Sequence, residues 1–531
     1  MTISTDARSL REMLDDGLEY ALIDVREQGL FGARHILLAV NIPLSRFELE
    51  IRRLVPRLDT RVVLCDGGEG VAARAAELMV AAGYANVALL EGGVDAWAAA
   101  GFELFSGVNV PSKLFGEYVE HHFGTPGISV EECKAMMADG TDMVILDSRP
   151  FAEFNNVTIP GAIDTPGAEL VLRVRDLAPN PETLVVVNCG GRTRSIIGAQ
   201  ALINAGLPNR VVDLTNGTMG WRLAGYELEK GAHRQCGPVS AEAIAWAQAA
   251  AGRVAERFGV RGIDAAGLAA WRAEEDRRSL YVLDVRFPEE FAAGHLPGSR
   301  SAPGGQLVQA TDEYVATRHA RIVLVDDNGV RATITASWLV QLGWQDVAVL
   351  HGGLEGLETV SGIDEPEIPG LSGLSLPAVE VDDLREGLAD GSAAVIDFSD
   401  SLTSGRGHSP GAWWANRVDL AAAAENLPDV SMYVVMAPEK GMALLGGQDL
   451  LRHTKAAVKW LPGGLGAWTG AGFEAERGSD RTLSEPNDKY HRFFGHPTKA
   501  EAAMKQYLEW EINLIDQIKR DGTLSFPHFA P

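Results

Sequence analysis

The chain has 531 residues, 46% of them hydrophobic and 22% charged, which is typical of a globular protein too long for one core. A formal net charge of −25 argues against nucleic acid or an anionic membrane as a partner, because both bind cationic surfaces. No apolar run approaches the roughly 20 residues that span a bilayer, and the first residues lack an apolar signal segment, so we expect a cytoplasmic protein.

One pattern of elements recurs four times along the chain. Each copy opens with an amphipathic helix, followed by an apolar strand that ends in an aspartate. A second apolar strand ends in a loop 40 to 42 residues after that aspartate, and a glycine-containing turn closes the copy. The strand-ending aspartates are Asp24, Asp147, Asp284 and Asp397, and the corresponding loop positions are Cys65, Cys189, Asp326 and Ala437.

Because strands alternate with helices, each copy predicts an α/β domain around a largely parallel sheet. We call these domains units one to four and expect them at residues 1–108, 121–232, 260–362 and 374–478. Residues 109–127 are expected to link units one and two, and the insertion at about 231–260 contains an Ala-rich helical stretch from Ser240 to Phe258.

A C-terminal helical tail is expected at residues 479–531. Its helical run, Lys499 to Arg520, is too short to form a core of its own, so it should pack on the repeats or on a second subunit, which makes a homodimer possible. The apolar side chains that share one face of this helix are Met504, Leu508, Ile512, Ile515 and Ile518.

The most informative loop lies in unit two, between a buried strand and a predicted helix. Cys189 stands at the end of that strand, where loop amides converge and the helix dipole favours a thiolate. Two arginines in the same loop add positive charge and bind anions as forks. The pattern predicts a nucleophilic thiolate that acts on a small anion. The loop residues after the cysteine are Gly190, Gly191, Arg192, Thr193, Arg194 and Ser195.

The other three loops are poorer in reactive groups. Cys65 is followed by Asp66 and Glu69 and by no arginine, and carboxylates raise the pKa of a thiol and repel anions, so Cys65 is only a possible second site. Units three and four carry Asp326 and Ala437, so a cysteine mechanism is excluded there and ligand binding or docking remains.

Several further residues are expected to have supporting roles. Asp147 should brace the Cys189 loop from the neighbouring strand, and Arg149 should either join it or reach the substrate. Cys133 falls on the apolar side of a helix and is expected in a core, whereas Cys236 lies in a linker and is expected to be exposed. The four cysteines are too widely spaced for a disulfide framework or a zinc site, and we expect no metal.

Together these landmarks resemble the rhodanese family. The Asp-x-Arg strand end, the His-x-Pro-Gly turn at His295, the Cys-initiated loop CGGRTRS and the turn that ends in tryptophan match its pattern in order and spacing. The resemblance covers about residues 1–478 as four tandem rhodanese-like domains of bacterial type. It implies that each domain has a mainly parallel five-stranded sheet flanked by helices.

The resemblance also implies a chemistry. Cys189 would attack the sulfane sulfur of thiosulfate or a similar donor, release sulfite and hold the sulfur as a persulfide. Cyanide, a small thiol or a protein acceptor would then collect the sulfur. Arg192 and especially Arg194 would neutralise the sulfonate, with Arg149 as a further substrate-binding candidate, and no cofactor would be needed.

Three alternatives remain open. Mercaptopyruvate is a narrower choice of donor, since its carboxylate also suits the arginines. A cysteine-dependent phosphatase or arsenate reductase would place an arginine six residues after the cysteine, where this chain has Ser195. A non-catalytic sulfur-carrier scaffold would fit the three poorer loops.

Overall fold

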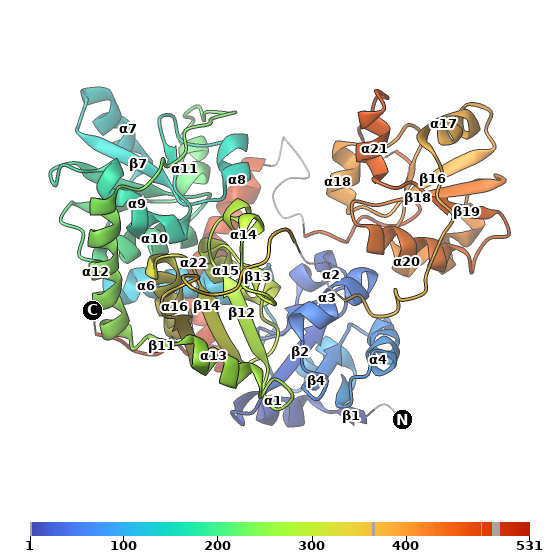
Figure 1. Ribbon diagram of the computed structural model, residues 1–531, viewed down its shortest axis with the longest axis horizontal. Coiled ribbons are helices and arrows are strands. Elements are labelled where there is room, and N and C mark those ends of the chain that lie inside the picture. Colours follow the sequence, from blue (N-terminus) through green and yellow to red (C-terminus); the bar gives the residue numbers. More distant parts are fainter. Residues whose placement is uncertain (1–2, 364–366, 479, 491–499, 531) are drawn as a thin grey trace.

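The computed structural model describes residues 3–363, 367–478, 480–490 and 500–530. Four sheets form, one in each predicted unit, and every strand pair within them in the described residues is parallel. Units one to three are grouped together, whereas unit four stands to one side and touches unit one (Figure 1).

Unit one has the strand order β1-β5-β4-β2-β3, and β4 ends at Cys65 in the centre of the sheet. Its strands are β1 (Ile3–Thr5), β2 (Tyr20–Asp24), β3 (Val40–Asn41), β4 (Arg61–Cys65) and β5 (Val87–Leu90). Its helices are α1 (Ala7–Asp15), α2 (Gln28–Ala33), α3 (Phe47–Leu54), α4 (Val71–Ala81) and α5 (Gly93–Ala99).

Unit two repeats this order as β6-β10-β9-β7-β8, and its central strand β9 is buried at every residue, as a strand covered on both faces requires. Its strands are β6 (Gly127–Ile128), β7 (Met143–Asp147), β8 (Ile163–Asp164), β9 (Leu184–Asn188) and β10 (Val211–Leu214). Its helices are α7 (Val130–Asp139), α8 (Phe151–Asn156), α9 (Leu170–Leu177), α10 (Thr193–Asn204) and α11 (Gly217–Leu223).

Unit three has the same topology, β11-β15-β14-β12-β13. Its strands are β11 (Arg261–Ile263), β12 (Leu280–Asp284), β13 (Arg300–Ser301), β14 (Arg321–Val325) and β15 (Asp346–Leu350). Its helices are α13 (Ala265–Arg272), α14 (Pro288–Ala293), α15 (Gly304–Gln309) and α16 (Val330–Gln341).

Unit four departs from the five-stranded expectation, since its sheet has four strands in the order β17-β16-β18-β19. At the place of the fifth strand, Ala378 forms only an isolated parallel bridge to Trp460. Its strands are β16 (Ala393–Asp397), β17 (Trp413–Trp414), β18 (Met432–Met436) and β19 (Ala457–Trp460). Its helices are α17 (Val381–Ala389), α18 (Ser401–Arg406), α19 (Leu420–Ala423), α20 (Lys440–Leu450) and α21 (Gly464–Gly470).

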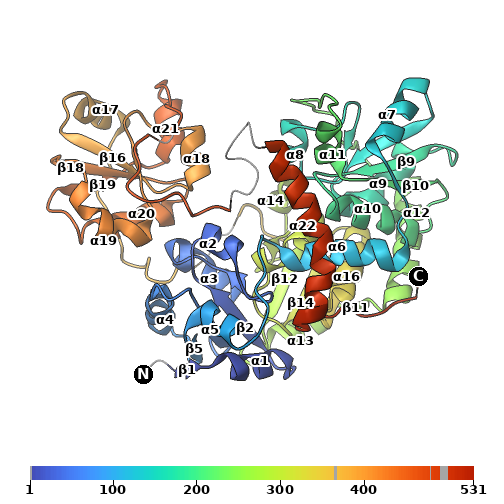
Figure 2. The same cartoon turned by 180° about the vertical axis from the view of Figure 1, so that it is seen from behind.

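Three helices lie outside the repeated pattern. The residues expected to be a linker after unit one form α6 (Val110–Phe123). The Ala-rich insertion forms α12 (Ala241–Phe258) as predicted, and Ser240 is its N-cap. The tail forms α22 (Ala500–Asp521), and Figure 2 shows it crossing α6.

The tail packs on its own chain, although the buried face differs from the predicted one. Leu508 and Leu514 are buried as an apolar face requires, and Leu514 enters the core of unit one. Ile512, predicted on this face, is 47% exposed, and the buried residue one position earlier is the charged Glu511. A carboxylate is therefore buried where the sequence suggested only hydrocarbon.

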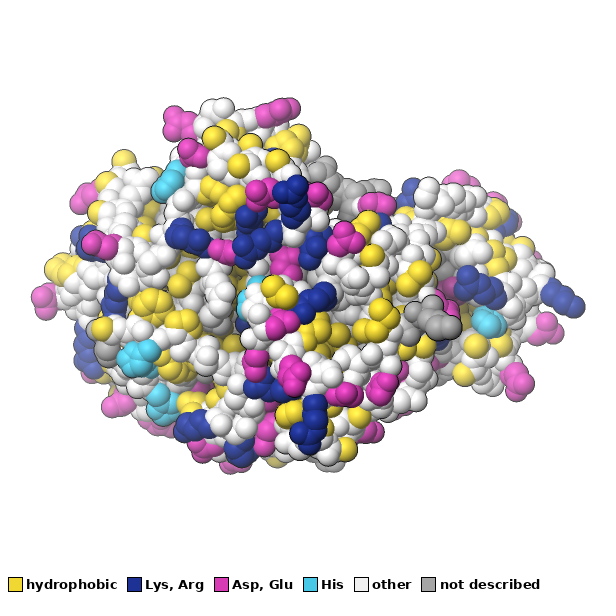
Figure 3. Space-filling view, turned by 90° about the horizontal axis from the view of Figure 1, so that it is seen from below, with side chains coloured by type: hydrophobic (Ala, Val, Ile, Leu, Met, Phe, Trp, Pro, Cys, Tyr) yellow, Lys and Arg dark blue, Asp and Glu magenta, His cyan; other side chains and the backbone are white. Residues whose placement is uncertain are grey.

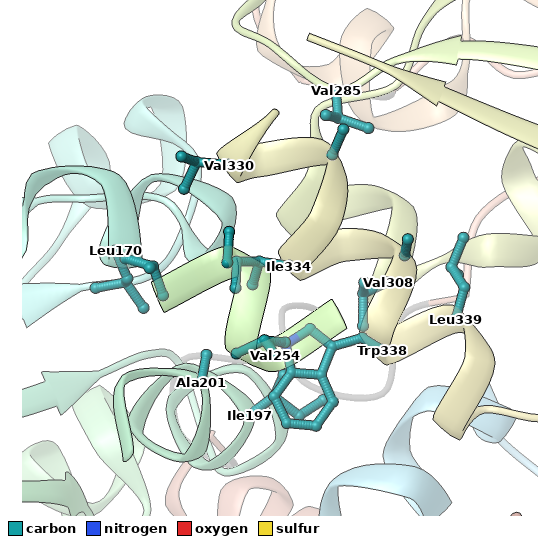
Figure 4. Packing of buried hydrophobic residues seen from close by; sticks show 14 of the residues in the cluster. Leu170, Ile197, Ala201, Val254, Val285, Val308, Val330, Ile334, Trp338 and Leu339 are labelled. Carbon is teal, nitrogen blue, oxygen red and sulfur yellow. The ribbon is translucent and has the colours of Figure 1, made fainter. Parts of the chain in front are cut away.

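Units two and three share one continuous hydrophobic core. Leu170 and Ile197 of unit two pack with Ile334 and Trp338 of unit three, and Val254 of α12 completes the cluster (Figure 4). At the edge of this interface the guanidinium of Arg331, only 1% exposed, pairs with carboxylates of both units. Its partners are Glu169, Glu290 and Asp327.

Basic and acidic side chains are interspersed on the face seen in Figure 3, so this face has no large patch of a single charge. Among the described residues, no helix is both long and apolar enough to cross a membrane.

Candidate active site

Cys189 lies directly after β9, at the carboxyl end of the central strand of unit two. Three loop residues separate it from α10, which begins at Thr193. The Cys189 side chain is only 2% exposed, and its Sγ lies 3.2 Å from the Oγ of Ser195 in the first turn of α10. The thiol is therefore held at the N-terminal end of a 12-residue helix, where the helix dipole is positive.

The main chain of Cys189 is fixed by the start of α11. The backbone N–H of Thr218 donates to the carbonyl oxygen of Cys189 at 3.0 Å, and that of Met219 donates to Gly190 at 3.1 Å. Gly217 permits this approach, because it has a positive φ of 52° and carries no Cβ. The glycine-containing turn at the end of the repeat thus positions the loop.

Burial changes the expected ionisation of the nucleophile. Burial raises the pKa of the Cys189 thiol above its ordinary value, and the charge of Arg194 and the Ser195 hydroxyl only partly oppose this. Burial therefore opposes the thiolate that the loop sequence predicts. Burial also raises the pKa of the nearby Asp213 carboxyl to about 7, and the Ser195 hydroxyl only partly opposes this. That hydroxyl donates its hydrogen bond to the carbonyl of Arg192 at 2.9 Å.

Both predicted anion-binding arginines already hold carboxylates. Arg194 donates from its two terminal nitrogens to Glu153 of α8 at 2.7 and 2.8 Å. Arg192 donates from Nε to Glu117 at 2.6 Å and also pairs with Glu120, both on α6. The positive charge that the loop sequence suggested is neutralised by residues 41 to 75 positions away.

Asp147 lies at the end of the neighbouring strand β7, where the sequence predicts a brace for the loop. Asp147 accepts hydrogen bonds from Nε of Arg149 at 2.9 Å, from Thr158 at 2.7 Å and from the amide of Asn188 at 3.0 Å. Arg149 also donates to the carbonyl of Val157 at 2.6 Å. The guanidinium of Arg149 is thereby committed to holding the strand end, next to the residue that precedes Cys189.

The corresponding loops of units one and three bind their own carboxylates. The prediction that Cys65 corresponds to Cys189 is wrong by one residue, because Cys65 pairs with Asp24 inside β4 as Asn188 pairs with Asp147 inside β9. Asp66 takes the place of Cys189 in unit one, and its carboxylate accepts from the backbone N–H groups of Gly68 and Ala72 at 3.0 Å each. In unit three the Asp326 carboxylate accepts from the backbone N–H groups of Ala332 at 3.1 Å and of Gly329 at 2.6 Å. Burial and nearby aspartates raise the pKa of the Cys65 thiol well above its ordinary value. The backbone N–H groups of both loops are therefore already bound to the carboxylates of Asp66 and Asp326.

The other two cysteines and two histidines lie outside the Cys189 loop. Cys133 is buried in a core, as predicted. Cys236 was predicted to be exposed but is partly buried, and burial raises the pKa of its thiol to about 11. His295 and His408, which stand before the Pro-Gly turns of units three and four, each place Nδ1 2.9 Å from a carbonyl oxygen.

Sequence reasoning missed the residues that cover the loop from outside the repeat. Lys113 and Glu117 come from α6, and Tyr507 and Glu511 come from α22. A Cβ atom at Gly191 would lie 3.4 Å from Cε1 of Tyr507, so α22 lies directly against the loop. No local motif signals these contacts, because they join the loop to segments 75 and 318 residues away.

Donor atoms of Glu117, Glu120 and His121 lie close enough to suggest a metal site. Both carboxylates are already bound to Arg192, so their charge is balanced by a guanidinium and the cluster is an ion-pair network.

The geometry can be compared with known proteins. The family model described as "Rhodanese-like domain" matches residues 6–100, 129–224 and 265–359. A crystal structure of a thiosulfate sulfurtransferase from Pseudomonas aeruginosa is 46% identical, with a TM-score of 0.93 over 99% of this chain and 100% of that one.

Two curated relatives match a stretch of this chain shorter than one unit. Thiosulfate sulfurtransferase GlpE of Pseudoalteromonas translucida is 29% identical over 83 residues, which cover 16% of this chain and 77% of the relative. Its namesake in Pseudomonas paraeruginosa is 33% identical over 76 residues, which cover 14% of this chain and 66% of the relative. Three matched repeats in one chain, together with four similar sheets, place this protein in the rhodanese family.

Proposed function

We propose that the chain is a thiosulfate-type sulfurtransferase in which unit two performs the chemistry through Cys189. The observation that carries the proposal is the position of Sγ at the N-terminal end of α10, 3.2 Å from the Ser195 hydroxyl. The names of the relatives support the reaction class.

In the first half-reaction the Cys189 thiolate attacks the sulfane sulfur of thiosulfate. A new S–S bond forms to Cys189 while the sulfur–sulfur bond of the donor breaks, and sulfite leaves with that electron pair. The terminal sulfur then carries the negative charge of a persulfide, which the Ser195 hydroxyl and the loop amides stabilise as hydrogen-bond donors.

In the second half-reaction an acceptor attacks the terminal sulfur. With cyanide the product is thiocyanate, and the electron pair of the broken S–S bond returns to Cys189 as thiolate. A small thiol or a protein thiol would take the sulfur in the same way. The sulfur–sulfur bonds are made and broken by the cysteine, the donor and the acceptor alone.

Formation of the attacking thiolate needs a proton acceptor, because burial raises the pKa of the thiol. Asp213 is buried beside Ser195, and its carboxyl has a pKa of about 7. We assign Asp213 the role of holding the proton that the thiol loses.

Units one, three and four take supporting roles in this proposal. Asp66 and Asp326 occupy the loop amides of units one and three with carboxylates, and Ala437 provides no nucleophile in unit four. Unit three also contributes directly to unit two, because Gln306 lies 3.5 Å from the guanidinium of Arg194.

The test is sulfite release from thiosulfate in the presence of cyanide, with mercaptopyruvate assayed in parallel as the alternative donor. We expect Cys189→Ser to abolish the release, whereas the matched variants Cys65→Ser and Cys236→Ser retain it. Full activity in Cys189→Ser would overturn the assignment, and faster turnover of mercaptopyruvate would replace thiosulfate as the donor.

A further inference from the structure

Units one to three bury a phenylalanine at one equivalent position, and unit four does not. Seven residues after each strand-ending aspartate, the first three units carry a phenylalanine that is at most 5% exposed. These residues are Phe31, Phe154 and Phe291. At the same position unit four carries Ser404, which is also 5% exposed. A place that holds a buried aromatic ring in three units therefore holds only a hydroxymethyl group in unit four.

The histidine that follows this position keeps its place in units one, three and four. In each unit its Nδ1 lies 2.9 to 3.0 Å from the carbonyl oxygen of the phenylalanine or of Ser404, four residues earlier. These histidines are His35, His295 and His408. In units one and three the imidazole stacks on the phenyl ring, with ring centroids 3.9 and 3.7 Å apart. Ser404 supplies no such ring, and His408 is partly exposed, whereas His35 and His295 are 1% exposed.

A cavity of about 390 Å³ lies beside Ser404 and His408 in unit four. Ala412 and Trp414 line it from the turn and the short strand that follow α18, and Leu402, 37% exposed, lines it from α18 itself. A single ring needs less space than this, since an apolar cavity of about 150 Å³ holds benzene. Sites for small molecules begin at about 300 Å³. The cavity is therefore large enough for an aromatic ring that carries a further group.

More arginines than carboxylates line the same cavity. The arginines are Arg406, Arg477 and Arg481, and the acidic residues are Glu476 and Asp480. The Glu476 carboxylate accepts a hydrogen bond from the backbone N–H of Gly411 at 3.0 Å and lies 3.8 Å from the guanidinium of Arg481. In a chain with a formal net charge of −25, this wall has an excess of positive charge. Guanidinium groups bind carboxylates and phosphates as planar forks, so the wall suits an oxyanion.

We propose that unit four binds a small aromatic oxyanion in this cavity. The ring of the ligand takes the place of the missing phenyl ring and lies against the imidazole of His408, with Trp414 as a second aromatic wall. The acidic group of the ligand, a carboxylate or a phosphate, is held by Arg406 and Arg481. Unit four thus has a binding role that needs no nucleophile of its own and does not depend on sulfur transfer at Cys189.

The sister units supply the variant that closes the site. Ser404→Phe introduces the side chain that units one to three carry, so it should fill the cavity and keep the fold. Calorimetric titration of 2-naphthoate into the unaltered full-length chain should show one molecule bound per chain. Ser404→Phe should weaken this binding at least about 10-fold while the melting temperature stays the same or rises. The matched control Ser431→Phe adds the same ring at an exposed position of unit four and should keep the affinity.

The charge of the ligand is tested separately from its ring. Arg406→Gln and Arg481→Gln should each weaken 2-naphthoate binding about 3- to 10-fold, because each removes one charge-assisted contact. Arg452→Gln, whose side chain is 66% exposed and does not line the cavity, should leave the affinity unchanged. The cation 2-naphthylmethylamine and the ring-free anion acetate should both bind at least about 10-fold more weakly than 2-naphthoate. Titration of 2-naphthyl phosphate in parallel distinguishes a phosphate from a carboxylate as the preferred acidic group.

Three results would overturn the inference. Absence of binding of both naphthyl anions to the unaltered chain, or equal affinity in Ser404→Phe, would show that the cavity is not a site for an aromatic ring. Equal affinity for 2-naphthylmethylamine would exclude an oxyanion as the ligand. If Ser404→Phe fails to fold, the two arginine variants decide the question, and unchanged affinity in both would contradict the site. Cys189→Ser should bind 2-naphthoate as the unaltered chain does, so the outcome is independent of the proposed sulfur transfer.

Discussion

The carbonyl oxygen of Cys189 lies 2.3 Å from the position that a Cβ atom would take at Gly217. Real Cβ atoms do not approach an oxygen so closely, and Gly217 also has the left-handed φ that favours glycine. The same contact recurs in every unit, between Gly93 and Asp66 at 2.1 Å, between Gly353 and Asp326 at 2.4 Å, and between Gly464 and Ala437 at 2.9 Å. The turn that closes each repeat therefore fixes the main chain of its loop.

We predict that Gly217→Ala displaces the Cys189 loop and lowers kcat/KM for sulfur transfer at least about 10-fold, because small misplacement of a nucleophile is costly. The backbone strain should also destabilise unit two by about 1–3 kcal/mol. The matched variant Gly464→Ala makes the same change in unit four. It should lower the melting temperature without affecting turnover, and wild-type kinetics in Gly217→Ala would contradict the account.

The second prediction concerns the attachment of α22. Leu514 is 1% exposed and packs in the core of unit one, so Leu514→Ala should weaken the docking of the helix by about 2–5 kcal/mol. Cys189 should then react faster with iodoacetamide, measured by the alkylation rate of its tryptic peptide. Ile512→Ala on the exposed face of the same helix is the control. Equal alkylation rates in both variants would show that α22 does not restrict access to the thiol.

The third prediction uses Asp213, whose pKa rises from 3.8 to about 7 in the fold through burial. The folded state binds more protons than the unfolded state between these values, so the contribution of Asp213 to stability is present at low pH and is lost as pH rises toward 7. Each pKa unit corresponds to about 1.4 kcal/mol. Asp213→Asn removes the titration, and its melting temperature relative to wild type should be higher at pH 8 than at pH 5.

The comparison with wild type at each pH cancels the titration of other buried groups. Asp382→Asn, on an exposed helix position, should show no such difference between the two pH values. A relative melting temperature of Asp213→Asn that is the same at pH 5 and pH 8, or lower at pH 8, would contradict the assigned pKa.

The repeat, the sheets and the Cys189 loop could be predicted because their signals are local. The strand-ending Asp147, the loop glycines and the turn at Gly217 each impose a conformation through neighbours in sequence. Counting landmarks in four copies then predicted four α/β domains with largely parallel sheets. The prediction of a fifth strand in unit four was wrong, because only Ala378 pairs at that place.

The electrostatics of the site could not be predicted from the loop sequence. Arg192 and Arg194 suggest a cationic loop, yet their partners Glu117 and Glu153 lie on α6 and α8. Likewise, the burial that raises the pKa of Cys189 depends on packing against α22, far along the chain. Local spacing carries no information on such contacts.

The most direct test of the central claim is intact-protein mass spectrometry after incubation with thiosulfate, followed by peptide mapping of any added sulfur. The account predicts the gain of one sulfur atom on the peptide that contains Cys189, removed again by cyanide, and none on Cys65, Cys133 or Cys236. Sulfur on another cysteine with Cys189 unmodified would contradict it.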